Sequence, residues 1–352
     1  MQTEALPANE MDVAGEQALY RAMRNFWHPV MYASELGEDR PAKAVLLDQD
    51  LVLVRLGGEV RCFRDLCLHR GTALSLGWVE GDRLRCAYHG WTYDPEGVAV
   101  EIPARPELSG HLKVQLTRYP VREKDGLIWV SLVEEPVFPI PEFPEYGDGS
   151  YRVVAGPVYE WKCSAPRRLE NFVDFAHFAW IHDGVLGTRD RPEVPDHDVI
   201  REGGELRFAY PDYIEPSHIE KNEGLAPTTE EIETDISYRL FMPFTVLLEQ
   251  RVPGDKHYVL FFSVCPIGPK RIRNFTFMSR DYALDEETDQ KMLEFNELVI
   301  SQDRPIVESQ RPEELPVDLS AELHVRGVDA ISLQYRRWLI ELARSERTAA
   351  ST

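Results

Sequence analysis

The sequence predicts an α+β protein in which a small all-β domain precedes a larger domain, whose curved antiparallel sheet packs against helices. Three observations predict this class. Short runs of Val, Leu and Ile with glycine turns dominate residues 43–134, and longer alternating runs fill residues 205–282. Between them, the segment EEPVFPIPEFPEYGDG carries four prolines between residues 136 and 144 and cannot form regular structure. We therefore place a linker there, between two domains.

In the first part of the chain, residues 20–36 are predicted to form a short helix that runs into an aromatic-rich loop. AVLLDQDLVLVRL (44–56) and EVRCF (59–63) flank a Gly-Gly pair, which predicts strands joined by a tight turn. The β character continues through DRLRC, GVAVEI and GLIWVSL and ends near residue 134.

The second part begins with a helical segment around residues 168–182, followed by a loop rich in Pro and Asp at 189–198. Five alternating segments then predict the sheet: ELRFAY, EIETDISYRLFM, FTVLLEQRV, HYVLFFSVCPI and RIRNFTFMSRDY. Residues 285–310 are strongly helical with acidic residues in their first turn, and a last helix covers 331–346.

The predicted domain boundaries are 1–40 for an N-terminal helix and entry segment, 41–135 for the all-β domain, 136–149 for the linker, 150–345 for the larger domain and 346–352 for a flexible tail.

Composition limits the class of partner. The 352 residues include 43% hydrophobic and 28% charged residues, which is typical of a globular protein. A net charge of -21 argues against nucleic acid or an anionic membrane surface as a partner. No apolar run approaches the length of a membrane span, and the start, MQTEALPANEMDVAGEQ, lacks the basic and apolar regions of a signal peptide. We therefore expect a cytoplasmic protein.

The chain has five widely scattered cysteines, and this odd number does not indicate a disulfide framework. Cys62, Cys163 and Cys265 lie in apolar or strand-like segments and are expected to be reduced packing residues. Cys67 and Cys86 need another explanation, because each has a histidine beside it.

The stretches CLHRG and CAYHGW pair Cys67 with His69 and Cys86 with His89, with sixteen residues between the two pairs. Zinc is held by two Cys and two His in many structural sites, whereas a Rieske [2Fe-2S] cluster has two Cys on one iron and two His on the other. Zinc fingers usually pair Cys with Cys and His with His, but here each loop supplies one of each. The spacing therefore favours a cluster and leaves zinc as the alternative.

A second constellation lies in LENFVDFAHFAWIHDG, which sets Asn171, Asp174, His177 and His182 among apolar side chains. Buried ionisable groups need partners or a metal. In a regular α-helix, a separation of five residues would rotate His182 away from His177. The imidazoles can converge only if the helix ends or widens between them, for example with a π-type turn around 179–180, so we predict an irregularity. The alternative is two ordinary core histidines near a helix end.

Two histidines need a carboxylate to complete the facial triad of a non-haem Fe(II) oxygenase. Asp303 lies on the apolar stripe of the helix predicted at 285–310, because it is three or four residues away from apolar residues on either side. A carboxylate there is costly unless a metal compensates it, so Asp303 is predicted as the third ligand. Glu308, beyond a kink expected at Pro305, is the second candidate and is expected to cap or pair instead. The stripe is predicted to consist of Leu293, Val299, Ile300, Ile306 and Val307.

These motifs resemble those of the Rieske oxygenases. CLHRG…CAYHGW resembles the cluster motif of the ring-hydroxylating members, and N-x-x-D-x-x-H-x-x-x-x-H with a distant Asp resembles the iron-site signature of their α subunits. The resemblance runs from about residue 25 to 315. In respiratory Rieske proteins, an additional Cys in each loop forms a disulfide. This chain has Thr72 and Tyr88 at those places, so we expect a potential at the lower end of the Rieske range.

The resemblance implies a Rieske domain with one [2Fe-2S] cluster and a catalytic domain with one mononuclear Fe(II) held by His177, His182 and Asp303. It also implies a head-to-tail homotrimer, in which Asp174 bridges His177 and the cluster ligand His89 of a neighbouring subunit. Electrons would then cross between subunits along this path.

The implied function is that of a terminal oxygenase in a multicomponent system. It would use O2 and reductase-delivered electrons to hydroxylate or oxidatively demethylate a small, ring-containing organic substrate. The chain shows no Gly-rich nucleotide fingerprint, so NAD(P)H is expected to act only through a separate flavin reductase, with or without a ferredoxin. Its length resembles the smaller branch that consists of α subunits alone, in which monooxygenation is common. Asn171 is expected to tune the iron pocket without ligating the iron.

Three alternatives remain open: cis-dihydroxylation of an aromatic ring, a Rieske electron carrier with an inactive second domain, and a zinc-stabilised binding module. The intact second constellation argues against a carrier. The segments from 206 to 280 are expected to line the substrate pocket, and residues 215–231 to form an exposed loop at its entrance.

Overall fold

The computed structural model describes residues 13–216, 231–252 and 254–349 of the chain. They group into two compact units: Arg24–Ile140 forms one, and the described parts of Met1–Met23 and Pro141–Thr352 form the other. The entry segment at 24–40 thus belongs to the β-rich unit, and the second division falls inside the proline-rich linker. None of the helices within the described ranges has the length and apolarity needed to cross a lipid bilayer.

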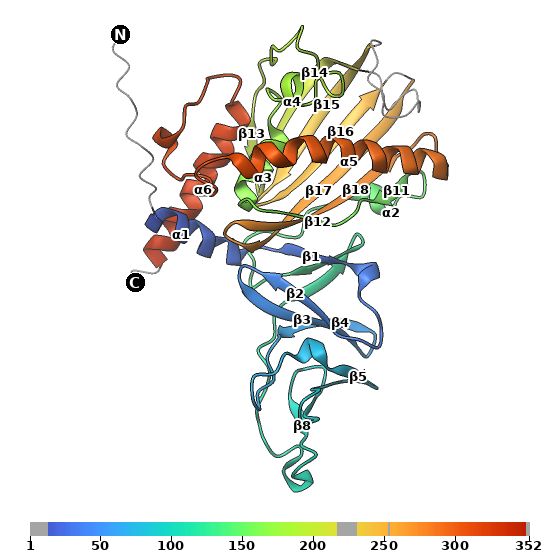
Figure 1. The fold of residues 1–352 in the computed structure, drawn as a ribbon, viewed down its shortest axis with the longest axis vertical. Helices are drawn as coiled ribbons and strands as arrows, with labels where there is room; N and C mark the ends of the chain where they lie inside the picture. Colours follow the sequence, from blue (N-terminus) through green and yellow to red (C-terminus); the bar gives the residue numbers. More distant parts are fainter. Residues whose placement is uncertain (1–12, 217–230, 253, 350–352) are drawn as a thin grey trace. The chain divides into compact units, whose positions relative to one another are not determined.

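The first unit consists of antiparallel strands arranged in three small sheets (Figure 1). One sheet has the order β1-β10-β9, the second β2-β3-β4 and the third β5-β6-β7-β8. The bounds of these strands are β1 His28–Tyr32, β2 Ala42–Leu46, β3 Gln49–Leu56, β4 Glu59–Arg64, β5 Trp78–Glu80, β6 Arg83–Arg85, β7 Thr92–Tyr93, β8 Ala99–Glu101, β9 Val121–Lys124 and β10 Leu127–Val130. Three short 3-10 helices, at Ala33–Glu35, Leu74–Leu76 and Pro106–Leu108, connect them.

The short helix predicted to begin at residue 20 is wrong in its position, and the loop predicted to follow it is wrong at residues 28–32, which form a strand. The helix α1 (Val13–Ala22) begins and ends earlier, and a 3-10 turn at Met23–Asn25 follows it. His28–Tyr32 is a fully buried strand that pairs with β10. The reason is local, because Pro29 lacks the N–H that a helix interior requires, while its neighbours are large side chains that suit a buried strand.

The second unit contains one large antiparallel sheet in the order β11-β18-β17-β16-β15-β14-β13, with β12 pairing with β18. The bounds are β11 Arg152–Ala155, β12 Tyr159–Trp161, β13 Ile200–Glu202, β14 Glu205–Pro216, β15 Glu231–Phe241, β16 Thr245–Val252, β17 Lys256–Gly268 and β18 Arg271–Arg280. All five predicted strand segments are confirmed as β14 to β18. Residues 217–230 are outside the described ranges, so the predicted entrance loop there stays a prediction.

Alternation along β15 explains why this segment forms a strand. Thr234, Ile236, Tyr238 and Leu240 are buried, whereas the residues between them are exposed or half-buried. Since successive side chains of a strand point to opposite faces, one face of the sheet here contacts the core. β17 and β18 are buried along most of their length, and each has strand partners on both sides.

Helices cover the sheet in the second unit, and Figure 1 shows α5 lying across one face of it. Their bounds are α2 Pro144–Gly147, α3 Ala165–Val173, α4 Phe178–Ile181, α5 Glu286–Ser309 and α6 Ala330–Ala349. The helical segment predicted around 168–182 is therefore two helices, α3 and α4, with a break at residues 174–177. α6 extends into the segment predicted as a flexible tail, because the residues after Glu346 include good helix formers such as Arg347 and Ala349.

The first turn of α5 is fixed by charged side chains. Asp285 is the N-cap, and its carboxylate accepts a hydrogen bond from the backbone N of Thr288 at 2.8 Å. Asp289, one turn further on, binds the guanidinium groups of Arg152 at 2.5 Å and Arg280 at 2.7 Å. These arginines come from β11 and β18, so the start of α5 is tied to the sheet.

Candidate metal centres

The two Cys/His loops of the first unit have the same backbone design. The N–H of Cys67 donates to Thr72 O at 2.8 Å, and that of Cys86 donates to Trp91 O at 2.8 Å. Each loop closes through a glycine with positive φ, Gly71 at 71° in the first and Gly90 at 70° in the second. Residues with a Cβ rarely adopt this conformation, so both loops depend on glycine to turn back over the cysteine.

The four side chains of these loops converge. Cys67 and Cys86 are buried, whereas His69 and His89 are exposed. The Nδ1 atoms of the two histidines lie 3.2 Å apart, and the ring of His69 stacks on Trp91 with centroids 5.0 Å apart. Two inner thiols and two outer imidazoles whose Nδ1 atoms face each other are a donor set that suits a [2Fe-2S] cluster.

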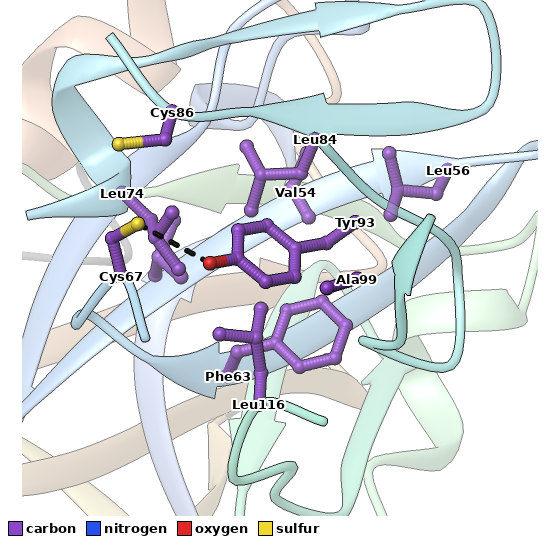
Figure 2. Close-up of a cluster of buried hydrophobic side chains, with 11 residues drawn as sticks. Val54, Leu56, Phe63, Cys67, Leu74, Leu84, Cys86, Tyr93, Ala99 and Leu116 are labelled. Atoms are coloured by element: carbon purple, nitrogen blue, oxygen red, sulfur yellow. Dashed lines mark hydrogen bonds between the residues drawn. The ribbon is translucent and has the colours of Figure 1, made fainter. Parts of the chain in front are cut away.

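Tyr93 joins this centre, although the sequence did not single it out. Figure 2 shows its hydroxyl directed at Cys67, and the Oη–Sγ distance is 3.2 Å. The backbone N–H of Leu68 donates to the same oxygen at 3.2 Å. Burial raises the pKa of Tyr93, so the hydroxyl keeps its proton and can donate it towards the sulfur. The ring packs in the core of this unit with Leu84 and Leu116, among other buried residues.

The second centre brings together three residues that are distant in sequence. One ligand atom each from His177, His182 and Asp303 lies within 4.8 Å of the others. Asp303 Oδ1 is 3.0 Å from His182 Nε2 and 3.5 Å from His177 Nε2. Asp303 is 5% exposed and His182 is fully buried. Two imidazoles and one carboxylate are the donors of a mononuclear non-haem Fe(II) site.

The end of α3 positions His177. Asp174 is the C-cap of this helix, and its carboxylate accepts hydrogen bonds from the backbone N–H of Ala176 at 3.1 Å and of His177 at 3.2 Å. It also accepts a hydrogen bond from His177 Nδ1 at 2.8 Å. Because Nδ1 is occupied by Asp174, Nε2 is the atom that faces Asp303.

The irregularity predicted between the two histidines is confirmed, but the suggested π-turn is wrong for the described segment 174–182. α4 is a single turn, with His177 as its N-cap and His182 as its C-cap. The backbone of His182 has left the helical conformation, with φ −109° and ψ 34°. The helix ends at Ile181, and this termination lets the second imidazole turn towards the first.

His182 is oriented by a residue that the sequence did not single out. Its Nδ1 lies 2.7 Å from Gln302 Oε1, and Gln302 precedes Asp303 on α5. A carbonyl oxygen can only accept, so Nδ1 carries the proton and Nε2 presents a lone pair. That Nε2 is buried and lies 3.0 Å from Asp303 Oδ1, but it forms no hydrogen bond with the described residues, because a lone pair and a carboxylate oxygen face each other there. An unpaired buried nitrogen is costly, and a metal ion bound to it would remove the cost.

Charge at this centre favours a cation. Burial by itself lowers the pKa of His177, but hydrogen bonds to the carboxylates of Asp174 and Asp303 raise it to about 9. Burial by itself raises the pKa of Asp303, but the neighbouring His177 and His182 and the charge of Arg168 bring it below its ordinary value. The carboxylates of Asp174 and Asp303 therefore favour a positive charge at the position of His177.

The remaining predicted residues occupy different places. Asn171 Nδ2 donates to Asp303 Oδ1 at 3.4 Å, so Asn171 lies beside the three converging residues. Glu308 lies elsewhere, because it accepts hydrogen bonds from the backbone N of Lys162 at 3.0 Å and from Arg304 Nε at 3.1 Å. Ile306 is 45% exposed, which corrects its assignment to the buried stripe.

The other stripe members differ from one another. Val307 is buried, whereas Leu293, Val299 and Ile300 are half-buried. The buried residues of α5 are Thr288, Met292, Asp303 and Val307, so Val307 is the one member of the predicted stripe among them.

Comparison with known proteins gives two family matches. Residues 26–120 match the Rieske [2Fe-2S] domain, and residues 161–345 match the vanillate O-demethylase oxygenase C-terminal domain. These matches cover the first centre and the second centre respectively.

Individual relatives are similar to this chain over most of its length. Methylxanthine N1-demethylase NdmA of Pseudomonas putida is 36% identical, over 92% of this chain and 90% of its own length. Methylxanthine N3-demethylase NdmB of the same organism is 34% identical, with coverages of 92% and 90%. The structure of NdmA of Pseudomonas putida CBB5 with caffeine superposes with a TM-score of 0.83 and 35% identity, and it covers 94% of each chain.

Proposed function

Because the chain belongs to the Rieske non-haem iron oxygenases, we propose that it oxidatively removes a methyl group from nitrogen or oxygen of a small ring compound. The relatives named above are N-demethylases, and the matching C-terminal family is that of an O-demethylase. This favours demethylation over the cis-dihydroxylation that was left open as an alternative. We propose methylxanthines and methoxylated aromatic acids such as vanillate as the substrate classes to try first.

We assign Cys67, Cys86, His69 and His89 as the cluster ligands, and His177, His182 and Asp303 as the ligands of the mononuclear iron. When bound, the cluster supplies single electrons and the iron activates O2 beside the substrate. One observation carries the proposal: the ligand atoms of His177, His182 and Asp303 lie within 4.8 Å of one another, and the buried Nε2 of His182 among them forms no hydrogen bond with the described residues.

The protein's own residues prepare this site before any substrate binds. Asp174 accepts a hydrogen bond from His177 Nδ1 at 2.8 Å, and Gln302 accepts one from His182 Nδ1 at 2.7 Å. In each histidine, Nε2 is therefore the nitrogen that faces the site. Partners of this kind orient the imidazole and raise its basicity. Asp303 and His182 are buried, so water is excluded from their ligand atoms, and this strengthens the interaction of these atoms with a cation.

The reaction balances with one O2 and two electrons for each methyl group. O2, two electrons and two protons convert R–X–CH3, where X is N or O, into R–X–CH2OH and water. The product then breaks its X–C bond to give R–X–H and formaldehyde. NAD(P)H is the electron source, through a separate flavin reductase with or without a ferredoxin. We propose the cytoplasm as the compartment, because NAD(P)H is available there.

We further propose a head-to-tail homotrimer in which His89 of one copy meets Asp174 of the next. Two observations support it, one from each unit. His69 and His89 are exposed, and so are Leu68 and Tyr88, which directly precede them in the chain. In the other unit, the Asp174 side chain is 29% exposed while it binds His177, so it connects the buried site to the surface.

Metal analysis and product analysis together test the proposal. Anaerobically purified protein should contain about three iron and two sulfide ions per chain. With a surrogate reductase and methylxanthines or vanillate, it should form formaldehyde in amounts equal to the demethylated product. Asp303→Asn should lose one iron and all product, whereas the matched variant Glu308→Gln should lose neither. A cis-diol product, or zinc without sulfide, would refute the proposal.

A further inference from the structure

Arg168 is a buried arginine on α3 that lies against the second centre. It is 2% exposed, as is its neighbour Arg167. The two side chains leave the helix in different directions, because Arg167 binds Glu322 at 2.5 Å and Pro312 O at 2.9 Å. Arg168 instead reaches towards Asp303, with Nη1 3.7 Å from Oδ2. A buried arginine needs a specific compensating environment.

Aromatic rings hold the guanidinium of Arg168. Its Cζ lies 4.4 Å from the ring centroid of Trp161 and 4.7 Å from that of Phe262. Phe172 stacks on Phe262 with centroids 4.2 Å apart and widens this aromatic surface. A planar guanidinium can stack on such rings and still direct its N–H groups along its edge, which an ammonium cannot do.

The edge of the guanidinium orients the amide of Asn171. Arg168 Nη1 donates to Asn171 Oδ1. A guanidinium has no acceptor, so the amide oxygen must face Arg168 and the amide nitrogen must face the other way. Asn171 Nδ2 donates to Asp303 Oδ1 at 3.4 Å, as this orientation requires.

The two oxygens of Asp303 are consequently in different environments. Oδ1 faces Nε2 of both histidines, at 3.0 Å and 3.5 Å. Oδ2 faces the positive charge of Arg168. We propose that Arg168 is a positioning residue, which holds Oδ2 so that Asp303 presents Oδ1 alone to the iron.

This inference rests on the proposed iron site and adds a consequence for the reaction. A carboxylate that binds through one oxygen leaves one more coordination position open than a carboxylate that binds through two. The positive charge of Arg168 also repels a metal cation, so the residue weakens metal binding while it keeps that position open. Its removal should tighten the metal and close the position, which is the opposite of what the loss of a purely structural residue would do.

The test uses full-length protein from which the mononuclear iron has been removed by chelation, with the cluster retained, and Co(II) as the probe. Co(II) affinity is measured by chelator competition, and the Co(II) absorption bands report its coordination number. Arg168→Met removes a positive charge near the metal and should bind Co(II) about tenfold more tightly than the wild type, with weaker bands that indicate higher coordination. Arg168→Lys keeps the charge but not the planar fork, so it should change the bands with an affinity within about threefold of the wild type.

Arg167→Met is the matched control, because Arg167 is equally buried on the same helix. It should lower the unfolding temperature but leave the affinity and the bands unchanged. The inference is overturned if Arg168→Met loses Co(II), or if both Arg168 variants keep the wild-type bands. If the wild-type protein itself binds no Co(II) after chelation, the proposed iron site fails, which is a separate result.

Discussion

Gln302 Oε1 accepts a hydrogen bond from His182 Nδ1 at 2.7 Å, so two adjacent residues of α5 serve the same imidazole. Gln302 fixes the tautomer and Asp303 lies at the opposite nitrogen. Gln302→Leu removes the acceptor and should weaken iron binding by roughly 10–100-fold, as the loss of such a partner does. Chelator competition measures this. Gln290→Leu, on the exposed side of the same helix, should leave iron binding unchanged, and an equal loss in both variants would contradict the assigned role.

Tyr93→Phe should lower the reduction potential of the cluster. The hydroxyl lies 3.2 Å from Cys67 Sγ and stabilises the extra negative charge of the reduced state. Loss of one hydrogen bond of about 1 kcal/mol corresponds to a decrease on the order of 40 mV for a one-electron couple. Redox titration followed by absorption or EPR measures it. Tyr119→Phe changes another buried tyrosine of the same unit and should not move the potential.

Asp174→Asn should slow turnover by roughly 10–100-fold while the iron content stays that of the wild type. The side-chain oxygen of an asparagine can still accept a hydrogen bond from His177 Nδ1, but it carries no negative charge. We propose that this charge is needed where Asp174 meets the cluster ligand of a neighbouring copy. Formaldehyde formation and the rate at which O2 and substrate reoxidise the reduced cluster give the two readouts. Asp190→Asn, an exposed carboxylate in the same unit, serves as the control. A normal reoxidation rate in Asp174→Asn would contradict the proposed path.

Glu322→Gln should destabilise the second unit at neutral pH and have less effect in acid. Burial alone raises the pKa of Glu322, but Arg167 and Arg336 bring it below its ordinary value. Its stabilising contribution is therefore fully present above the unfolded-state pKa of about 4.3, and it is lost as the pH falls through the folded-state pKa.

Urea unfolding at pH 7 and near pH 4 measures this dependence, and the difference between wild type and Glu322→Gln should shrink at the lower pH. Glu287→Gln, in which an 80% exposed side chain is changed, should match the wild type at both values. A difference that grows in acid would show that the pKa of Glu322 is shifted the other way.

The five long strands and the two Cys/His loops could be predicted because their signals are local. Alternation of apolar residues identifies β14 to β18, and the loop motif identifies Cys67 and His69 directly. Contacts between distant segments leave no such signal. Gln302 and Arg168 look like ordinary helix residues, and their roles depend on where α5 and α3 lie in the folded unit. The exposure of Ile306 could not be predicted for the same reason. Helical spacing shows which residues share a face of the helix, but it does not show how much of that face other elements cover.

The attachment of α5 at Asp289 has a consequence for how the protein can diversify. Asp289 is tied to the sheet by Arg152 and Arg280, and fourteen residues, or about 21 Å of helix, separate it from Asp303. Because α5 is held near both of these residues, side chains between them can be replaced without displacing either one. Mutations in the middle of α5 can therefore reshape the neighbouring space during evolution or engineering while Asp303, which we propose as an iron ligand, stays in place.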